Sequence, residues 1–185
     1  MKTKSLIIFI IVVILAVGGL GLYMSSRPSQ YDGFAKALKE KGALFYGAFW
    51  CPHCQEQKAE FGTSKKYLPY IECSNPDNTQ TQVCIDKKIE SYPTWMFKDG
   101  IKLISSTEPV ICPILKEGAS PDGNCANSSS SYYRSWVFGE YKFSIKSPTD
   151  PIKTGDTWQF PAEAQVTGAL PLTFLAEQIQ FTLPQ

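Results

Sequence analysis

The sequence predicts an α/β domain, and two observations support that prediction. An apolar run, Ala43 to Phe49, leads into the motif WCPHC at residues 50–54, and a charged helical pattern follows the motif at once. Strand-like and helix-like segments then continue to alternate, with turn residues between them. A buried strand is therefore expected to run into a tight turn, and that turn is expected to open a helix.

The elements before the motif are a helix and the central strand. Residues 31–41 carry apolar side chains at helical spacing, and Gly42 ends the pattern. Asp32 is the expected N-cap of this helix. Residues 43–50 contain several bulky apolar side chains, which suits a strand covered on both faces.

The elements after the motif continue the alternation. The helix that the motif opens is expected to reach about Lys66, although Gly62 weakens it. Residues 67–73 predict a second strand, a turn cluster occupies residues 74–78, and residues 79–90 predict another helix.

The N-terminus predicts a membrane anchor. Lys2 and Lys4 precede Ser5 to Ser26, a stretch of 22 uncharged residues that is long enough to span a bilayer. The lysines would keep the N-terminus in the cytoplasm and place everything after Arg27 outside. A signal peptide cleaved near the small residues 16–18 is the alternative, and either segment would export the rest of the chain.

Length and composition suit one exported domain with appendages. The chain has 185 residues, of which 43% are hydrophobic, so it can build an ordinary globular core. Residues 1–30 are expected to form a cytoplasmic stub, the anchor and a linker, and residues 31–185 the folded domain. A net charge of +1 gives no electrostatic footprint for nucleic acid, so no such partner is expected.

The motif itself predicts redox chemistry at Cys51 and Cys54. Cys51 would lie at a helix N-terminus, where free N–H groups and the helix dipole favour a thiolate, and Pro52 fits the first turn. The two cysteines are three residues apart and close enough to bridge, while His53 between them can stabilise the thiolate. A zinc half-site is the alternative, but no second CxxC exists and His53 is the single histidine, so no metal is expected.

Six cysteines in a chain of this length indicate an oxidising compartment. Their spacing suggests three local pairs, which are Cys51–Cys54, Cys73–Cys84 and Cys112–Cys125. The first pair is the redox couple, and the other two are expected to be structural. The alternatives are two buried free thiols for the second pair, and free or catalytic thiols for the third.

The motif WCPHC resembles the WCxxC active site of the thioredoxin superfamily, and its Pro-His dipeptide is typical of the more oxidising, extracytoplasmic members. The resemblance implies a thioredoxin-like fold, in which helices flank a central mixed sheet. It also implies that Cys51 exchanges disulfides with a substrate and that Cys54 resolves the mixed disulfide.

The same resemblance extends to Pro93, which lies 42 residues after Cys51, about where thioredoxins place a cis-proline. A cis bond there would leave the backbone of Tyr92 free to pair with an extended substrate. Trp50 and Pro52 complete the expected substrate-binding residues. An ordinary trans proline at a strand start is the alternative reading of Pro93.

One departure from the thioredoxin pattern concerns proton transfer. In thioredoxin a buried Asp lies six residues before the first cysteine, and here that position is Phe45. The usual proton acceptor for the second cysteine is therefore missing. Glu56, Glu60 or water could serve instead, and the sequence does not select among them.

A closer resemblance links the runs at residues 46–58, 70–74 and 92–95 to the thioredoxin-like domain that accompanies bacterial and plant homologues of vitamin K epoxide reductase. It covers about residues 31–97 and resumes near the C-terminus. In that family the domain passes electrons from substrate thiols to a quinone-reducing membrane enzyme, and a pair resembling Cys73–Cys84 is a disulfide. The quinone-reducing part is absent here, so such an enzyme would be a separate chain.

The segment after Pro93 is longer than a thioredoxin ending needs. Residues 157–160, 165–168 and 172–179 resemble that ending, so residues from about 99 to 156 are expected to be a β-rich insertion in or beside the last hairpin. Residues 95–97 and 158–160 compete for the same strand, so the join is defined only to within several residues. Within it, residues 132–145 predict one hairpin that turns at Gly139-Glu140. The insertion is expected to be a local fold, with a substrate or partner platform as the functional alternative.

Together these observations predict a membrane-anchored, extracytoplasmic thiol–disulfide oxidoreductase that oxidises cysteine-containing exported proteins. No cofactor is expected, and the expected redox partner is a membrane protein resembling vitamin K epoxide reductase. The alternative is a thioredoxin-like binding module for copper or haem maturation that uses Cys51 and Cys54 as ligands. A scaffold protein with a vestigial redox site is a third reading.

Overall fold

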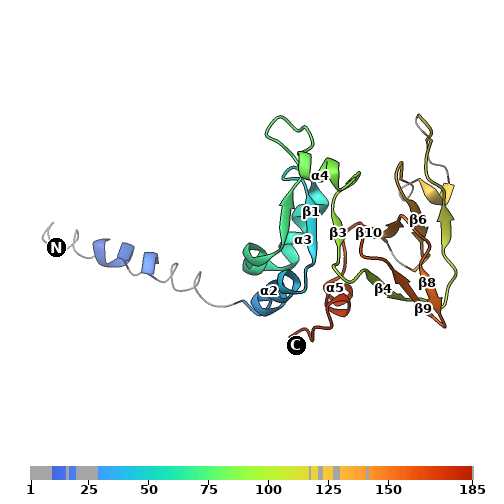
Figure 1. Cartoon of the computed structure of the whole chain (residues 1–185). Coiled ribbons are helices and arrows are strands. Elements are labelled where there is room, and N and C mark those ends of the chain that lie inside the picture. The colour runs from blue at the N-terminus through green and yellow to red at the C-terminus, as the bar shows by residue number, and fades with distance from the viewer. Residues whose placement is uncertain are drawn as a thin grey trace, which may run out of the picture. The chain divides into compact units, whose positions relative to one another are not determined.

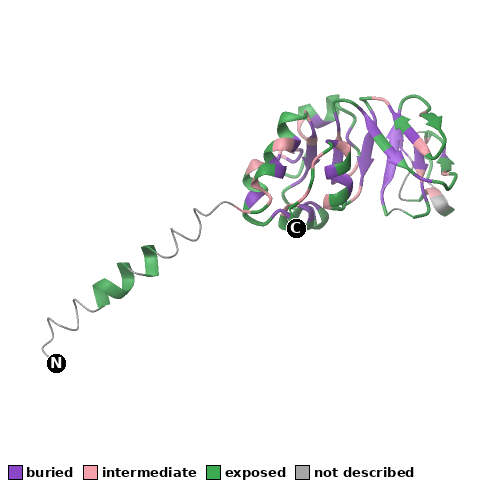
Figure 2. Cartoon of the chain, turned by 90° about the horizontal axis from the view of Figure 1, so that it is seen from below, coloured by how far each residue is buried: buried purple, intermediate pink, exposed green. Residues whose placement is uncertain are grey.

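A computed structural model describes residues 10–15, 17–19, 29–116, 118–120, 123–126, 130–140 and 142–184. The chain divides into two units, Met1–Gln30 and Tyr31–Gln185. Residues 10–15 and 17–19 of the first unit are helical and exposed (Figure 2). The predicted membrane-spanning segment, residues 5–26, falls largely outside the described residues. Within the described part of the chain, no helix has the length and apolar character needed to cross a membrane.

A mixed sheet runs through the second unit, which confirms the predicted mixed α/β class (Figure 1). Its seven strands lie in the order β2-β1-β3-β10-β7-β6-β5, and β2 is parallel to β1 while the other neighbours are antiparallel. The strands are β1 (Leu44–Gly47), β2 (Tyr70–Glu72), β3 (Thr94–Met96), β5 (Val110–Cys112), β6 (Arg134–Val137), β7 (Ser144–Ser147) and β10 (Gln165–Thr167).

Among the described residues of the second unit, four α-helices and two short 3₁₀ helices accompany the strands. They are α2 (Asp32–Glu40), α3 (Pro52–Glu60), α4 (Gln82–Asp86), α5 (Leu172–Gln178), η1 (Gly62–Tyr67) and η2 (Gly123–Cys125). The helix predicted to reach Lys66 ends at Glu60 and gives way to η1, because Gly62 adopts φ +54°. Asp32 is not the N-cap of α2: Tyr31 is, and the Asp32 carboxylate accepts a hydrogen bond from Ser64 Oγ at 2.7 Å. The helix predicted over residues 79–90 is shorter, at Gln82–Asp86.

The strand β1 is covered on both faces, as its composition predicts. Phe45 faces the larger core, where its ring stacks on Trp95 at 4.6 Å. Tyr46 points to the opposite face and belongs to a smaller cluster with Cys73, Cys84 and Ile89. Figure 2 shows many buried residues along the strands of the second unit.

A second sheet of three strands lies in the order β4-β9-β8, with β4 at Ile101–Ile104, β8 at Ile152–Thr154 and β9 at Thr157–Phe160. The sequence assigned residues 157–160 to the closing hairpin of the main sheet, and this assignment is wrong. Two rings of β9 pack edge-on against rings of β6 and the residue after it. The ring centroids of Trp158 and Phe138 are 5.5 Å apart, and those of Phe160 and Trp136 are 5.6 Å apart. Burial of these rings on the second sheet therefore outweighs pairing with β3.

The strand that closes the main sheet beside β3 is β10. Val166 of β10 lies opposite Trp95 of β3 on one side and Ile145 of β7 on the other. The segment between β3 and β10 therefore spans residues 97–164, more than the predicted 99–156. The predicted hairpin within it is present as β6 and β7, and it extends the main sheet instead of folding apart from it.

Candidate functional site

The WCPHC motif opens α3, as the sequence predicts. Cys51 is the N-cap residue, with φ −77° and ψ 119°, and Pro52 begins the helix. The Cys51 carbonyl accepts the first helical hydrogen bond from Gln55 N at 3.2 Å. Cys51 is 6% exposed and Cys54 is fully buried, and neither is disulfide-bonded. Both thiols are therefore buried, and Cys51 is the one that keeps a small solvent-accessible area.

The buried thiol of Cys54 packs against the strand that leads into the motif. A Cβ added to Gly47 would lie 2.9 Å from Cys54 Sγ, so only glycine lets the strand approach the sulfur this closely. Burial raises the pKa of Cys54 to about 12, although a hydrogen bond from the Ala48 backbone opposes that rise. Cys54 is thus a poor thiolate unless another group handles its proton.

Trp50, Tyr92 and Pro93 lie around the accessible thiol. The Tyr92–Pro93 peptide bond is cis. Cys51 Sγ donates a hydrogen bond to the Tyr92 carbonyl at 3.6 Å. Trp50 is 47% exposed, its ring meets that of Tyr92 edge-on at 6.0 Å, and its Nε1 donates to Ser74 Oγ at 2.8 Å. The structure therefore brings the predicted substrate-binding residues together beside Cys51.

His53 lies on the exposed side of the motif. Its Nδ1 is 3.1 Å from Glu56 Oε2, and both side chains are largely solvent-exposed. This contact turns the imidazole toward the helix surface. The role predicted for His53 in stabilising the Cys51 thiolate stays a prediction.

The position where thioredoxin has its buried Asp is filled by aromatic packing. The Phe45 ring meets Tyr70 at 5.2 Å in addition to its stacking on Trp95. Neither predicted substitute points to Cys54, because Glu56 pairs with His53 and Glu60 Oε2 accepts from Gln57 Nε2 at 2.7 Å. The place of the missing acid is therefore filled by an apolar ring.

A lysine and a glutamate that the sequence analysis did not single out contact Tyr70, whose ring borders Cys54. Lys58 follows Cys54 by one helical turn, and its Nζ lies 3.2 Å from the centroid of the Tyr70 ring. Glu72 accepts hydrogen bonds from Tyr70 Oη at 2.9 Å, Phe49 N at 3.1 Å and Ser74 N at 3.0 Å. The i, i+4 spacing of Cys54 and Lys58 was the sequence signal that could have found the lysine.

The other four cysteines form two disulfides. Cys73–Cys84 has a Cα–Cα distance of 5.5 Å and both residues are buried, while Cys112–Cys125 has a Cα–Cα distance of 5.6 Å and links β5 to η2. Among the described residues, no group of three or more His, Cys, Asp or Glu side chains is placed to hold a metal ion.

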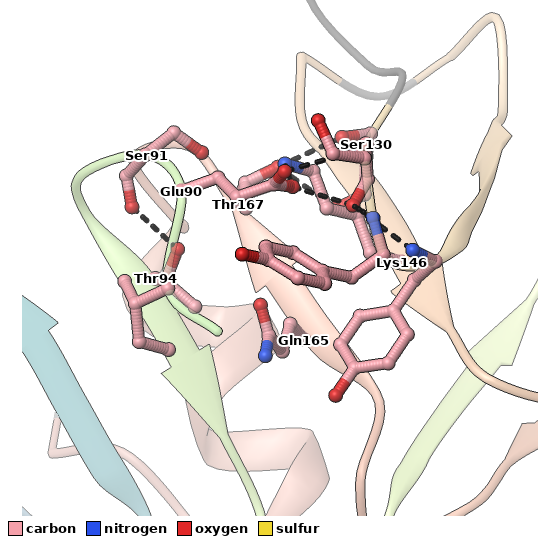
Figure 3. A network of polar contacts seen from close by, with 12 residues as sticks. Glu90, Ser91, Thr94, Ser130, Lys146, Gln165 and Thr167 are labelled. Atoms are coloured by element: carbon pink, nitrogen blue, oxygen red, sulfur yellow. Dashed lines mark hydrogen bonds and ion pairs between the residues drawn. The ribbon is translucent and has the colours of Figure 1, made fainter. Parts of the chain in front are cut away.

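The insertion is attached to the loop that carries the cis-proline through Glu90 (Figure 3). Lys146 of β7 is buried, and its Nζ lies 3.3 Å from Glu90 Oε2. The same carboxylate accepts hydrogen bonds from Ser130 Oγ and from Ser131 N, the latter at 2.9 Å. Ser130 Oγ in turn accepts from two backbone N–H groups, those of residues 132 and 133. Glu90 therefore fixes two separate segments of the insertion three residues before Pro93.

The arrangement can perform thiol–disulfide exchange. Cys51 is the less buried of the two thiols, Cys54 lies one turn further into the helix, and the Tyr92 backbone is adjacent to Cys51. The two sulfurs differ in burial, and burial raises the pKa of Cys54. That asymmetry suits a first attack at Cys51 and a resolving step at Cys54.

Comparison with known proteins supports a thioredoxin-superfamily domain. No family model matches the chain. Thiol-disulfide oxidoreductase LTO1 of Arabidopsis thaliana is 44% identical over 85 residues, which cover 42% of this chain and 22% of that protein. Thioredoxin domain-containing protein 5 homolog of Drosophila melanogaster is 35% identical over 81 residues, which cover 37% of this chain and 19% of that protein. The chain thus spans about a fifth of the length of these curated relatives.

Proposed function

We propose that this protein is a thiol–disulfide oxidoreductase that forms or exchanges disulfides in exported proteins through the Cys51–Cys54 couple. The oxidoreductase class is supported by the 44% identity with a thiol-disulfide oxidoreductase. The observation that carries the proposal is the free Cys51–Cys54 pair at the start of α3, with Cys51 Sγ 3.6 Å from the carbonyl of Tyr92.

In the oxidising direction, a substrate thiolate attacks Cys51 Sγ of the Cys51–Cys54 disulfide. The substrate–Cys51 bond forms, the Cys51–Cys54 bond breaks, and Cys54 leaves as a thiolate that takes up a proton. A second substrate thiolate then attacks the substrate sulfur of the mixed disulfide and releases Cys51. The substrate gains a disulfide, and the enzyme pair is left reduced.

Oxidation of exported proteins is the direction we propose, because the Pro-His dipeptide and the absence of an acid at Phe45 both favour the reduced couple. The reduced pair then needs an electron acceptor. A membrane protein resembling vitamin K epoxide reductase would be that acceptor, in keeping with the resemblance of residues 46–58 to domains that accompany such enzymes.

A membrane anchor at residues 5–26 belongs to the same proposal. It would confine the domain to a thin layer outside the membrane, which raises its effective concentration near membrane enzymes. The catalytic domain would then be extracytoplasmic. Six cysteines in a chain of this length suit such an oxidising compartment, because disulfides form and persist there.

Trapping with Cys54→Ala tests the function. This variant lacks the resolving thiol, so mixed disulfides with Cys51 should accumulate in the exported fraction, and mass spectrometry identifies the partners. We expect secreted cysteine proteins and one polytopic membrane protein. The Cys51→Ala, Cys54→Ala double variant is the control and should trap nothing.

Two outcomes would contradict the proposal. If Cys54→Ala traps no partner in cells that are oxidising their secreted proteins, the proposal that Cys51 exchanges disulfides with them is contradicted. If copper copurifies with the wild-type pair and is lost in the double variant, the metal-binding alternative takes its place.

A further inference from the structure

The opening of the Cys51–Cys54 disulfide leaves a charge on a buried sulfur. Cys54 is fully buried, so its thiolate would lie in an environment that penalises charge. An unprotonated Cys54 would attack Cys51 again and expel the substrate. A nearby proton donor would prevent that return, and the apolar packing of Phe45 cannot supply one.

Lys58 is the cationic group that lies over the Tyr70 ring, and this ring borders the sulfur. It projects from α3 four residues after Cys54, on the same face of the helix. Its Nζ lies over the Tyr70 ring at 3.2 Å from the centroid. A Cβ on Gly47 would be 2.8 Å from Tyr70 Cε2 and 2.9 Å from Cys54 Sγ, so the ring and the sulfur meet at the same point of β1. The ammonium therefore lies on the ring that borders the thiol.

Glu72 holds this arrangement in place. Its carboxylate receives the Tyr70 hydroxyl on one oxygen and two backbone N–H groups on the other, at residues 49 and 74. The bond at residue 49 anchors the turn that leads into the motif, and the bond to Tyr70 fixes the ring under Lys58. Glu72 is therefore a positioning residue for both the motif and the lysine.

We propose that the Lys58 ammonium donates a proton to the Cys54 thiolate when the disulfide opens, and that the neutral amine takes the proton back when it closes. In the opening step a substrate thiolate bonds to Cys51 Sγ, the electron pair of the Cys51–Cys54 bond goes to Cys54, and one proton moves from Lys58 Nζ to Cys54 Sγ. When the disulfide closes again, Cys54 Sγ gives this proton back to the neutral amine as the Cys51–Cys54 bond forms. This inference rests on the proposed oxidoreductase function and assigns its proton donor.

The direction of proton transfer agrees with the charges that face the two groups. Burial lowers the pKa of Lys58 below 10.5, with Lys65 of η1 acting in the same sense, while Glu72 of β2 and Cys54 oppose it. Burial raises the pKa of Cys54 to about 12, and Cys51 adds to that rise whereas Lys58 reduces it. Tyr70 and Tyr92 also face the two cysteines, but burial raises the pKa of both phenols, so they stay neutral. Burial thus shifts the two pKa values in opposite directions, and both shifts favour a proton on Cys54 over a proton on Lys58.

The test compares Lys58→Met, Lys58→Arg and a matched control, Lys36→Met. Lys36 also lies over a tyrosine ring, that of Tyr67 at 4.4 Å, but belongs to α2. Oxidised protein is mixed with glutathione, quenched and alkylated, and mass spectrometry gives the rate at which the Cys51–Cys54 disulfide opens. We expect Lys58→Met to lower this rate on the order of a hundredfold and Lys36→Met to leave it unchanged.

Lys58→Arg separates proton transfer from charge. A guanidinium keeps the positive charge but does not give up its proton at these pH values, so Lys58→Arg should open as slowly as Lys58→Met. If Lys58→Arg restores the wild-type rate, charge alone suffices and the proposal is overturned. In the wild type, the rate corrected for the glutathione thiolate fraction should fall as pH rises and Lys58 loses its proton, and this fall should be absent in Lys58→Met.

A second measurement does not depend on turnover. In the Cys51→Ala background, iodoacetamide reacts with Cys54 in proportion to its thiolate fraction, and Lys58→Met should slow this reaction about tenfold at a given pH. An unchanged rate would show that Lys58 does not act on Cys54. If wild-type protein fails to react with glutathione, the proposed function fails, while the Cys54 alkylation rate still decides the role of Lys58. Should Lys58→Met not fold, the pH profile of the wild type and the rate of Lys58→Arg remain decisive.

Discussion

Lys58 and Lys146 are both drawn away from solvent and both lie near a glutamate, but their surroundings differ. Lys146 is buried and pairs directly with Glu90 at 3.3 Å, between the insertion and the cis-proline loop. Lys58 stays partly exposed over Tyr70, and the oxygens of Glu72 are taken up by other donors. A lysine in a direct ion pair stabilises structure, whereas a lysine that lies over a ring beside a thiol is placed for proton transfer.

The comparison teaches that proximity to an acid does not define the role of a lysine drawn away from solvent. Burial lowers the pKa of both ammonium groups, and a glutamate opposes this in both cases. The difference lies in what else is close: a reactive thiol beside Lys58, and loop residues 130 and 131 bonded to the same carboxylate beside Lys146. Stability should therefore depend on one pair, and disulfide chemistry on the other.

The largest expected effect is on the Lys146 side. Glu90→Gln leaves the buried ammonium of Lys146 without its counter-charge, and we expect it to lower the free energy of unfolding by about 3 kcal/mol. Urea unfolding followed by tryptophan fluorescence measures this change. The double variant Glu90→Gln, Lys146→Met should recover most of the loss, because no unpaired charge stays buried.

The matched control for that prediction is the exposed pair Arg134–Asp150, at 2.6 Å. Arg134→Met should change the free energy of unfolding by less than about 1 kcal/mol, because solvent screens this pair. If Arg134→Met and Glu90→Gln lower the free energy of unfolding equally, the exposed pair and the buried pair do not differ in their contribution to stability.

A smaller effect is expected where Gly47 lets β1 approach the thiol. Gly47→Ala places a methyl group 2.9 Å from Cys54 Sγ and 2.8 Å from Tyr70 Cε2, so the ring and the sulfur must move apart. We expect a loss of about 1–3 kcal/mol in the free energy of unfolding and slower opening of the disulfide by glutathione. Gly139→Ala, whose added Cβ meets no atom within 4 Å, is the control and should change neither quantity. A normal opening rate in Gly47→Ala would argue that the contact between ring and sulfur is irrelevant to the chemistry.

The smallest expected effect is the loss of stability when Glu90 is protonated at acidic pH. Burial acts to raise the pKa of Glu90, but hydrogen bonds from Ser130 and Ser131 together with the charge of Lys146 outweigh it, so the pKa lies below the usual 4.5. The stability from this carboxylate is therefore fully present above pH 4.5 and is lost as the pH falls through the lower folded value. Unfolding measured at a series of acidic pH values should show this loss in the wild type and not in Glu90→Gln. If both proteins lose stability alike over that range, another carboxylate is responsible.

The strand, turn and helix around the motif could be predicted because local sequence determines them. The apolar run, the turn that contains Pro52 and the charged helical pattern follow one another within a few residues. The exact helix ends were missed where a glycine with positive φ, as at Gly62, converts a helix to a 3₁₀ turn.

The sheet order beyond β3 could not be predicted, because it depends on contacts distant in sequence. Residues 157–160 alternate like any strand, and nothing local shows that Trp158 and Phe160 pack on rings of the insertion. The pairing of β10 with β7 has the same origin. Lys58 escaped notice for a related reason, since a lysine in a charged helix usually faces water and only the position of Tyr70 reveals otherwise.

The position of β10 between β3 and β7 makes the insertion inseparable from the rest of the domain. An excised version that joins residue 97 directly to residue 164 would leave β10 as a bare edge, with a row of unpaired N–H and C=O groups facing solvent. It would also strip Glu90 of Lys146 and Ser130 just before the cis-proline. A minimal version of this protein, made for engineering or for crystallisation, therefore has to keep the β6–β7 hairpin, whatever else is trimmed from the loops.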